Sequence, residues 1–153
     1  MPQFPSPTTG LIDGAMHRYA LRVYYEDTDA GGIVYHANYL RWFERARSDL
    51  LELLAIDQQA ALTSGLGGYT VAQVSIRYLA PARLGDVVNV ETSATRIGGA
   101  SCVMLQTALR GDTKLAEASV TVGFVGPEGK PRRQPRAWLE AFATIASEAE
   151  GQE

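Results

Sequence analysis

The sequence predicts an α+β domain in which one long helix packs against a five-stranded antiparallel sheet. Three features predict it: an alternating segment at residues 19–26, an amphipathic segment at 37–56, and four alternating segments between 69 and 125. The 153 residues suit one domain with one core. Hydrophobic residues make up 46% and charged residues 20%, which is typical of a globular chain and excludes disorder over most of it.

The start of the chain is expected to be loose and to lead into the first strand. Residues 1–16 hold three prolines and many small polar residues, which predicts a flexible arm. His17, at the edge of this arm, is expected to be solvated. Over residues 19–26, apolar side chains stand at every second position, as in a strand with one buried face. Residues 27–32 then have the aspartates and glycines of a turn.

The long helix is predicted from residue 37 to residue 56. At 100° per residue its large apolar side chains fall on one stripe, which needs a broad apolar surface to cover it. The stripe consists of Tyr39, Trp42, Phe43, Ala46, Leu50, Leu53 and Leu54. Residues 55–63 either continue the helix or follow it, and the glycines of residues 64–68 stop it.

The remaining strands are predicted at residues 69–79, 86–95, 101–110 and 113–125. The three junctions between them contain proline or glycine and are short enough for hairpins or tight turns, which predicts an antiparallel meander. Residues 136–146 are expected to form a short helix. The folded domain is therefore placed at residues 17–146, and residues 147–153 are expected to be an acidic disordered tail.

Composition excludes several classes of protein. The net charge of −3 and the pI near 5.4 give no reason to expect nucleic acid as the main partner. The lone Cys102 excludes an intramolecular disulfide, favours a reducing compartment and is expected to be a small strand residue. His17 and His36 are the only histidines, so no metal site is expected. The chain has no apolar run long enough to span a bilayer and no recognisable leader, so a cytoplasmic protein is expected.

The segment Tyr24–Tyr39 is the strongest candidate for chemistry. It joins a strand end, two flexible glycines and a helix start, with carboxylates beside it. A helix start presents unpaired N–H donors and a partial positive charge, which suit an oxyanion or a thioester carbonyl oxygen. A nearby carboxylate could then act on the carbonyl carbon or on water. The alternative is a turn and helix cap without catalytic function. A calcium loop is disfavoured because Gly31 and Asn38 stand where acidic ligands are needed.

The same segment resembles a known family. Residues 25–39, Tyr-Glu-Asp-Thr-Asp-Ala-Gly-Gly-Ile-Val-Tyr-His-Ala-Asn-Tyr, followed by Phe43–Arg47, resemble the hot-dog acyl-CoA thioesterases of the 4-hydroxybenzoyl-CoA thioesterase family. Residues 78–86 and 130–132 are similar to the branch associated with the bacterial Tol-Pal system. The likeness covers about residues 19–136. It implies a hot-dog fold, with the sheet wrapped around the central helix, and hydrolysis of acyl-CoA without a cofactor, since coenzyme A belongs to the substrate.

The resemblance also implies site residues. The family's catalytic aspartate matches Asp29, as nucleophile or as general base, and the accompanying tyrosine and histidine match Tyr25 and His36. The backbone N–H groups of Tyr35 and His36 would hold the thioester oxygen. A purely structural role at the helix start remains the alternative for His36. Glu44 lies off the apolar stripe near Arg47 and Ser48, which favours a structural ion pair.

Four arginines in turns or at strand ends are candidates for binding the phosphates of coenzyme A, with a solvated surface as the alternative for each. They are Arg83, Arg96, Arg132 and Arg133.

Partners and competing functions complete the expectations. The resemblance implies a homodimer or a dimer-of-dimers tetramer, with active sites where two chains meet, and an association with envelope or lipid-synthesis proteins. A hot-dog dehydratase or hydratase, or an interaction protein with weak hydrolase activity, remains an alternative. The sequence leaves the length and the aromatic or aliphatic nature of the acyl group open.

Overall fold

The structure is a computed structural model that describes residues 1–146, and the predicted acidic tail at 147–153 lies outside the described residues. Its elements, in chain order, are β1 (Leu11–Asp13), β2 (Met16–Arg22), the 3-10 turn η1 (Tyr25–Asp27), α1 (Asn38–Leu53), α2 (Gln58–Thr63), β3 (Gly68–Tyr78), β4 (Val87–Ile97), β5 (Ser101–Arg110), β6 (Thr113–Val125) and α3 (Arg136–Ala143).

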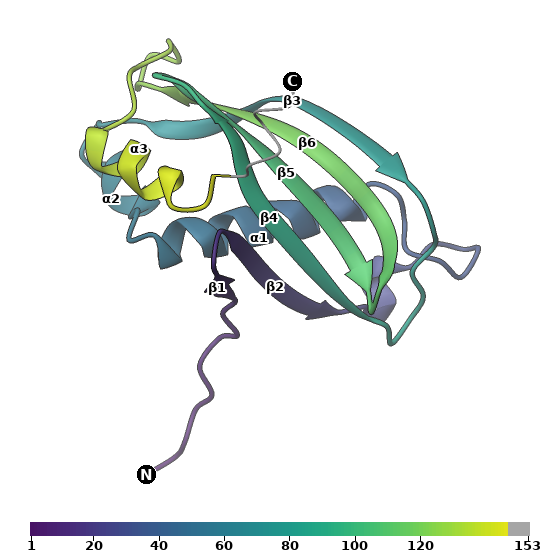
Figure 1. The fold of residues 1–153 in the computed structure, drawn as a ribbon. Helices are drawn as coiled ribbons and strands as arrows, with labels where there is room; N and C mark the ends of the chain where they lie inside the picture. Colours follow the sequence, from purple (N-terminus) through teal and green to yellow (C-terminus); the bar gives the residue numbers. More distant parts are fainter. Residues whose placement is uncertain (147–153) are drawn as a thin grey trace.

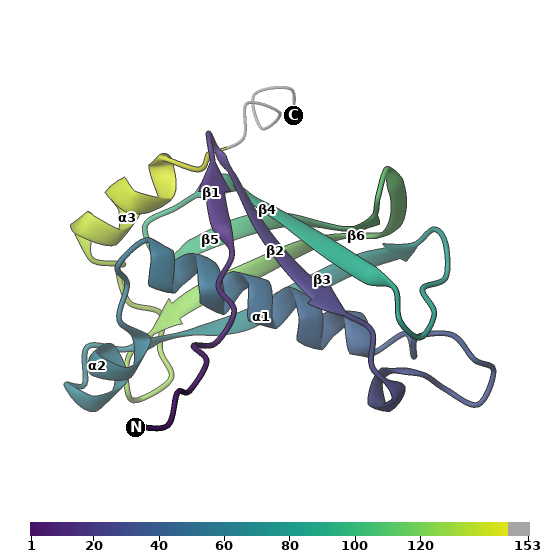
Figure 2. The same ribbon diagram turned by 90° about the horizontal axis from the view of Figure 1, so that it is seen from below.

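One antiparallel sheet curves around α1, which lies along its concave face (Figures 1 and 2). The strand order is β1-β2-β4-β5-β6-β3, so the sheet has six strands and not the five expected. The architecture is α+β, as predicted. Among the described residues, no helix is both long and apolar enough to cross a membrane.

The extra strand comes from residues that were expected to belong to the flexible arm. β1 pairs with β2 through a tight turn in which Gly14 has a φ of 64°. The Gly10 N–H donates to Asp49 of α1, 2.9 Å away, and the Nε2 of His17 lies 2.7 Å from the same Asp49 oxygen. His17 is fully buried, which corrects the expectation that it is solvated. The Asp49 carboxylate accounts for both the extra strand and the burial of His17. It is a hydrogen-bond partner for the Gly10 N–H and for the His17 ring, so neither group is left unsatisfied against α1.

The first predicted strand also ends early. β2 stops at Arg22, and Tyr25, expected on its buried face, lies in η1 with 83% of its surface exposed. The chain turns because the Tyr24 N–H donates to the Asp27 carboxylate at 2.8 Å. The Asp27 side chain thus takes the Tyr24 N–H that would otherwise continue the pairing of β2 with β4.

The predicted meander is correct for β4, β5 and β6 but wrong for β3. β3 pairs with β6 at the edge of the sheet, and β4 lies between β2 and β5. The connection at residues 79–86 therefore crosses from the sheet edge to its middle and is not a hairpin. It also passes the loop before α1, where the Val34 N–H donates to the Ala82 carbonyl at 2.9 Å.

The central helix follows its predicted apolar stripe closely. Five residues of the predicted stripe are buried as expected: Tyr39, Trp42, Phe43, Ala46 and Leu50. Leu53, however, is 40% exposed, and Leu51 is buried in its place. The helix ends before Ala55, whose φ of 62° breaks the turn, and Asp57 caps the separate helix α2 by accepting the Ala60 N–H.

The opposite end of the molecule from the loop before α1 holds an aromatic cluster, formed by Tyr69, Phe124, Trp138 and Phe142. Its rings meet at centroid distances of 5.2 to 6.1 Å. Gln134 is buried beside it, where its amide donates to the Gly98 carbonyl and accepts from the Tyr69 hydroxyl. This cluster attaches α3 and the chain before it to the sheet.

Candidate active site

Residues 27–35 form a narrow hairpin between β2 and α1. The Asp29 N–H donates to the Ile33 carbonyl at 2.8 Å, and the Tyr35 N–H donates to the Asp27 carbonyl at 2.9 Å. Gly32 has a φ of 84°, a conformation that glycine adopts without strain at the turn. The backbone pairing therefore fixes the positions of Asp27 and Asp29 within the hairpin.

The two aspartates of this hairpin have different environments. Asp27 is buried, and its carboxylate accepts from the Tyr24 N–H at 2.8 Å and from the Asn38 amide at 2.7 Å. Asp29 is exposed; its Oδ1 accepts the Gly31 N–H at 2.8 Å, and its Oδ2 has no partner among residues 1–146. Asp27 is thus occupied in positioning the helix start, whereas Asp29 is oriented by one oxygen and free at the other.

The helix start offers one of the two expected backbone donors. The Tyr35 N–H is already bound to the Asp27 carbonyl, so in this conformation it is not available to a substrate. The His36 N–H has no acceptor within the described residues. The hydroxyl of Tyr78 donates to the His36 carbonyl at 2.8 Å, which ties this residue to the end of β3.

Tyr25, Asp29 and His36 all lie on the exposed β2–α1 segment, and the described structure contains no hydrogen bond between their side chains. The His36 ring stacks obliquely on Tyr35, with centroids 4.6 Å apart, and meets the Tyr78 ring edge-on at 6.2 Å. The exposed surface of this segment thus carries an acid, an imidazole and a phenol, together with the backbone N–H of His36.

An apolar groove of about 340 Å³ adjoins this surface. Its lining residues are Ile33, Val34, His36, Tyr39, Tyr78, Leu79, Ala80 and Pro81. Burial raises the pKa of Tyr39 and of Tyr78, so both hydroxyls stay neutral. Residues 78–81 belong to a motif that matched the resemblance, but the sequence indicated no role for them. Only their position against His36 indicates a contribution to the site.

The segment after β3 is itself braced. Asp86 accepts the Arg83 N–H at 2.9 Å and the Arg110 guanidinium at 3.0 Å, and Arg110 also donates to the Pro81 carbonyl. These contacts hold the pKa of Asp86 below its usual range, the Arg83 N–H first and Arg110 second. The apolar wall of the groove is therefore held in place by an ion pair behind it.

The four candidate arginines do not converge within one chain. Arg83 pairs with Ile33 of the loop, beside the site. Arg96, near the end of β4, belongs to the far end of the sheet. There the Arg132 guanidinium donates to the carbonyls of Gly65 and Leu66, and that of Arg133 lies over Gly99. Arg83 comes just before the start of β4, whereas the other three arginines lie near its end. The length of this strand therefore separates them.

Other candidates have structural surroundings. Glu44 forms the predicted ion pair, with its Oε1 3.2 Å from Arg47, and accepts the Ser48 hydroxyl at 2.5 Å. Cys102 is buried in β5, as expected of a small strand residue. Within residues 1–146, no three His, Cys, Asp or Glu side chains are grouped so as to hold a metal ion.

Comparison with known proteins identifies the relatives of this arrangement. The model of the thioesterase superfamily matches residues 31–117. The acyl-CoA thioester hydrolase YbgC of Escherichia coli O6:H1 is 40% identical over 133 residues, covering 86% of this chain and 98% of that protein. The acyl-CoA thioesterase YbgC of Haemophilus influenzae is 42% identical over 125 residues, covering 81% and 92%. The crystal structure of a probable thioesterase from Bartonella henselae superposes with a TM-score of 0.74 at 36% identity, covering 78% of this chain and 99% of that one.

Proposed function

The chain belongs to the thioesterase superfamily and is an acyl-CoA thioester hydrolase, and we propose that Asp29 is the carboxylate that performs the reaction. One observation carries this assignment: of the two aspartates in the hairpin, Asp29 alone has an exposed oxygen without a partner among residues 1–146. The reaction adds water across the thioester and releases a carboxylic acid and the coenzyme A thiol.

Two courses are open to Asp29. As a nucleophile, its free Oδ2 attacks the thioester carbon, the thiolate leaves, and water then hydrolyses the mixed anhydride. As a general base, it takes a proton from water while the water oxygen attacks the same carbon. The C–S bond of the tetrahedral intermediate then breaks, and the thiolate leaves and takes up that proton. In both courses the Gly31 N–H, which donates to Oδ1, keeps the carboxylate oriented.

The negative charge on the thioester oxygen needs a donor at the same place. The His36 N–H meets this need, because it has no acceptor within the described chain and lies just before the positive end of α1. Tyr78 holds the next peptide group, because its hydroxyl donates to the His36 carbonyl. We assign the Tyr25 hydroxyl and the His36 ring to contacts with the substrate or with Asp29.

Replacing Asp29 by Asn tests the proposal, because Asn retains an oxygen for the Gly31 N–H and loses only the charge. We expect kcat/KM for acyl-CoA hydrolysis to fall about 10²- to 10⁴-fold, with the unfolding midpoint unchanged. The matched control is Glu26→Gln, which removes an exposed carboxylate of the same loop. Full activity in Asp29→Asn would refute the assignment.

A second chain is proposed to complete the site. β3 is an edge strand with exposed apolar side chains, among them Val71 (46% exposed) and Val74 (37%). Pairing of β3 with its own copy, antiparallel about its midpoint, would satisfy this edge and bury those side chains. Val74→Lys is expected to produce monomers in sedimentation and to lower activity, whereas Leu62→Lys on exposed α2 leaves both unchanged. A monomeric wild-type enzyme would contradict the pairing.

The contacts with coenzyme A, the location and the partners of the protein are predictions. Arg83 is the candidate for a phosphate of coenzyme A bound to its own protomer, because it pairs with Ile33 beside the site. Arg96, Arg132 and Arg133 can contribute only from another subunit, since they belong to the far end of the sheet. A cytoplasmic location and an association with envelope or lipid-synthesis proteins are predictions from the sequence and the resemblance.

A further inference from the structure

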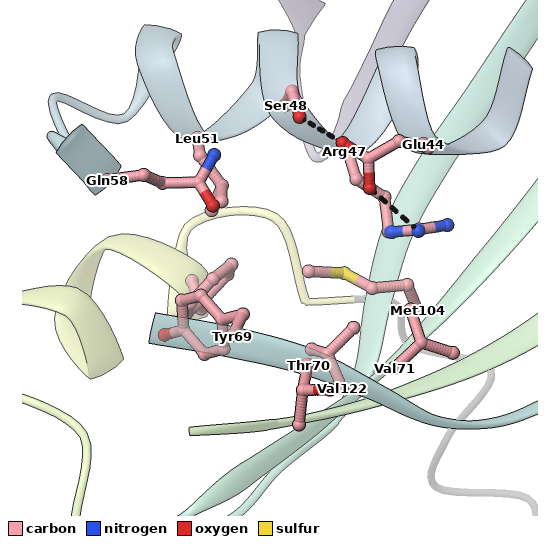
Figure 3. Close-up of a pocket in the computed structure, with 11 residues that line it drawn as sticks. Glu44, Arg47, Ser48, Leu51, Gln58, Tyr69, Thr70, Val71, Met104 and Val122 are labelled. Atoms are coloured by element: carbon pink, nitrogen blue, oxygen red, sulfur yellow. Dashed lines mark hydrogen bonds and ion pairs between the residues drawn. The ribbon is translucent and has the colours of Figure 1, made fainter. Parts of the chain in front are cut away.

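A second cavity lies between the C-terminal half of α1 and the first residues of β3 (Figure 3). Its interior space is about 60 Å³. Its apolar lining comes from Leu51, Met104, Val122 and Phe142, and its polar lining includes Glu44, Arg47 and Ser48, all from α1. Two charged side chains thus stand on one wall of a cavity whose other walls are largely apolar, which makes it a candidate for ligand binding.

The position of Arg47 is fixed from behind. Its side chain is 11% exposed, and its Nη1 donates to the side-chain amide oxygen Oε1 of Gln106 at 3.0 Å. Gln106 is itself buried and donates to the Phe43 carbonyl and to the Thr92 hydroxyl, each at 3.0 Å. Burial lowers the pKa of Arg47 and the Glu44 carboxylate opposes this, so the guanidinium stays charged. It has more N–H donors than its two acceptors use.

Glu44 lines the same side of the cavity and offers hydrogen-bond acceptors, whereas Arg47 offers donors. Its Oε1 accepts from Arg47 and its Oε2 from the Ser48 hydroxyl, and its side chain is 60% exposed. Because Glu44 neutralises Arg47, the cavity has no net charge that would attract a carboxylate. It offers a donor and an acceptor side by side, and a hydroxyl group is the small neutral group that uses both.

We propose that this cavity binds the far end of a short acyl group that carries a terminal hydroxyl, with Arg47 donating to that oxygen and Glu44 accepting its proton in a hydrogen bond. The size of the cavity limits the acyl group, since an apolar cavity that takes benzene has about 150 Å³. A space of about 60 Å³ accommodates the last few atoms of an aliphatic chain and excludes a long hydrocarbon tail.

The inference rests on the proposed pairing of β3, because within one chain the cavity and the Asp29 loop lie at opposite ends of that strand. Tyr78 contacts His36 at one end, and Tyr69 lines the cavity at the other. Antiparallel pairing of two copies brings the Tyr69 end of one chain beside the Tyr78 end of the other. An acyl group cleaved at one protomer's loop would then extend into the cavity of its partner.

The test compares terminally hydroxylated acyl-CoA substrates with analogues in which a methyl group replaces the hydroxyl. The first pair is 4-hydroxybutyryl-CoA and pentanoyl-CoA, and the series continues with chains one carbon shorter and longer. In the best pair we expect kcat/KM to be at least about tenfold higher for the hydroxylated substrate. Equal values throughout, or a preference for the methyl analogues, would overturn the inference while leaving the hydrolase activity established.

Variants connect any preference to the cavity. Glu44→Gln and Arg47→Met are expected to bring the ratio of the two kcat/KM values close to one, whereas Arg45→Met, on an exposed part of α1, leaves it unchanged. Glu44 is largely exposed, so its variant provides the answer even where Arg47→Met, which strands Gln106, fails to fold. A ratio that survives Glu44→Gln would contradict the assignment.

Binding separates this inference from the proposed chemistry. Calorimetric titration of the Asp29→Asn variant with both coenzyme A thioesters measures the preference without turnover. Tighter binding of the hydroxylated thioester, by about tenfold or more, supports the cavity even if no substrate is hydrolysed by the wild type. Equal binding of the two refutes it, whatever the role of Asp29.

Discussion

The two ends of this molecule use their polar groups in opposite ways. At the β2–α1 loop, the Asp29 Oδ2 and the His36 N–H are exposed and have no partner in the described chain. At the aromatic cluster, the Gln134 amide is buried and bonded at both its oxygen and its nitrogen. Both ends consist of polar groups beside aromatic rings, so composition alone does not separate them.

This difference indicates which polar groups stabilise the fold and which can take part in catalysis. A polar group with all its hydrogen bonds made inside the protein contributes to folding, and breaking one bond leaves a buried partner unsatisfied. A polar group held by one atom and open at another can act on a substrate. We therefore expect substitutions of Phe124 and Gln134, which do not line the proposed acyl cavity, to change the free energy of unfolding. Substitutions at the loop are expected to change kcat or KM.

The largest effect on stability is expected for Phe124→Ala. Phe124 is fully buried and contacts Tyr69 and Trp138, so its truncation leaves a cavity and should cost about 3–5 kcal/mol in urea denaturation. Folded molecules at low temperature should keep kcat/KM within about threefold. A large loss of kcat/KM without a loss of stability would remove the distinction between the two ends.

Gln134→Leu is expected to cost less, about 2 kcal/mol, by leaving the Tyr69 hydroxyl and the Gly98 carbonyl without partners. The control is Gln59→Leu on the exposed face of α2, which should change the free energy of unfolding by less than about 0.5 kcal/mol. If both variants unfold at the same urea concentration, the cluster does not depend on its internal hydrogen bonds.

Cys102 sharpens the comparison through pH. Burial raises the pKa of this thiol from 9.0 to about 11. The unfolded thiol therefore loses its proton first, and the free energy of unfolding should fall between pH 9 and pH 11, by about 1 kcal/mol per pH unit. Denaturation of the wild type and of Cys102→Ala over this range isolates the contribution, because the tyrosines titrate in both. Parallel pH profiles would show that the thiol titrates normally.

The smallest effect is expected for Tyr78→Phe, which removes only the hydrogen bond to the His36 carbonyl. Since this hydroxyl is on an exposed residue, we expect a two- to tenfold decrease in kcat, corresponding to about 0.5–1.4 kcal/mol, and an unchanged unfolding midpoint. Tyr19→Phe, whose hydroxyl has no hydrogen bond in the described chain, should leave kcat unaltered. A shifted midpoint in Tyr78→Phe would place this residue with the structural end.

The apolar periodicity of the sequence predicted helices and strands well where the side chains of the periodic face are the ones buried in the structure. The stripe from Tyr39 to Leu50 predicted α1, and alternation predicted β3 to β6 with ends within two residues. Leu53 and Leu51 exchanged roles at the last turn, where the helix end determines which side chain still reaches the sheet. Periodicity therefore determines a face, but not how far the covering surface extends.

The assignment of the site residues has a different source and stays a prediction. Asp29 and His36 came from the resemblance, and no local rule distinguishes Asp29 from Asp27, since both stand in the same turn. The structure distinguishes them by their partners: the Asn38 amide and the Tyr24 N–H bind Asp27. The same hairpin pairing removes Tyr35 as a donor, because its N–H meets the Asp27 carbonyl.

The sequence by itself determined the fold class, the long helix and four of the strands, because those depend on contacts between near neighbours and on the alternation of apolar side chains. Only the tertiary structure decided that β3 lies at the sheet edge, that β1 joins the sheet and His17 is buried, and that the four arginines separate. These outcomes depend on partners far away in the sequence, such as Asp49 for His17 and β6 for β3, which no local pattern specifies.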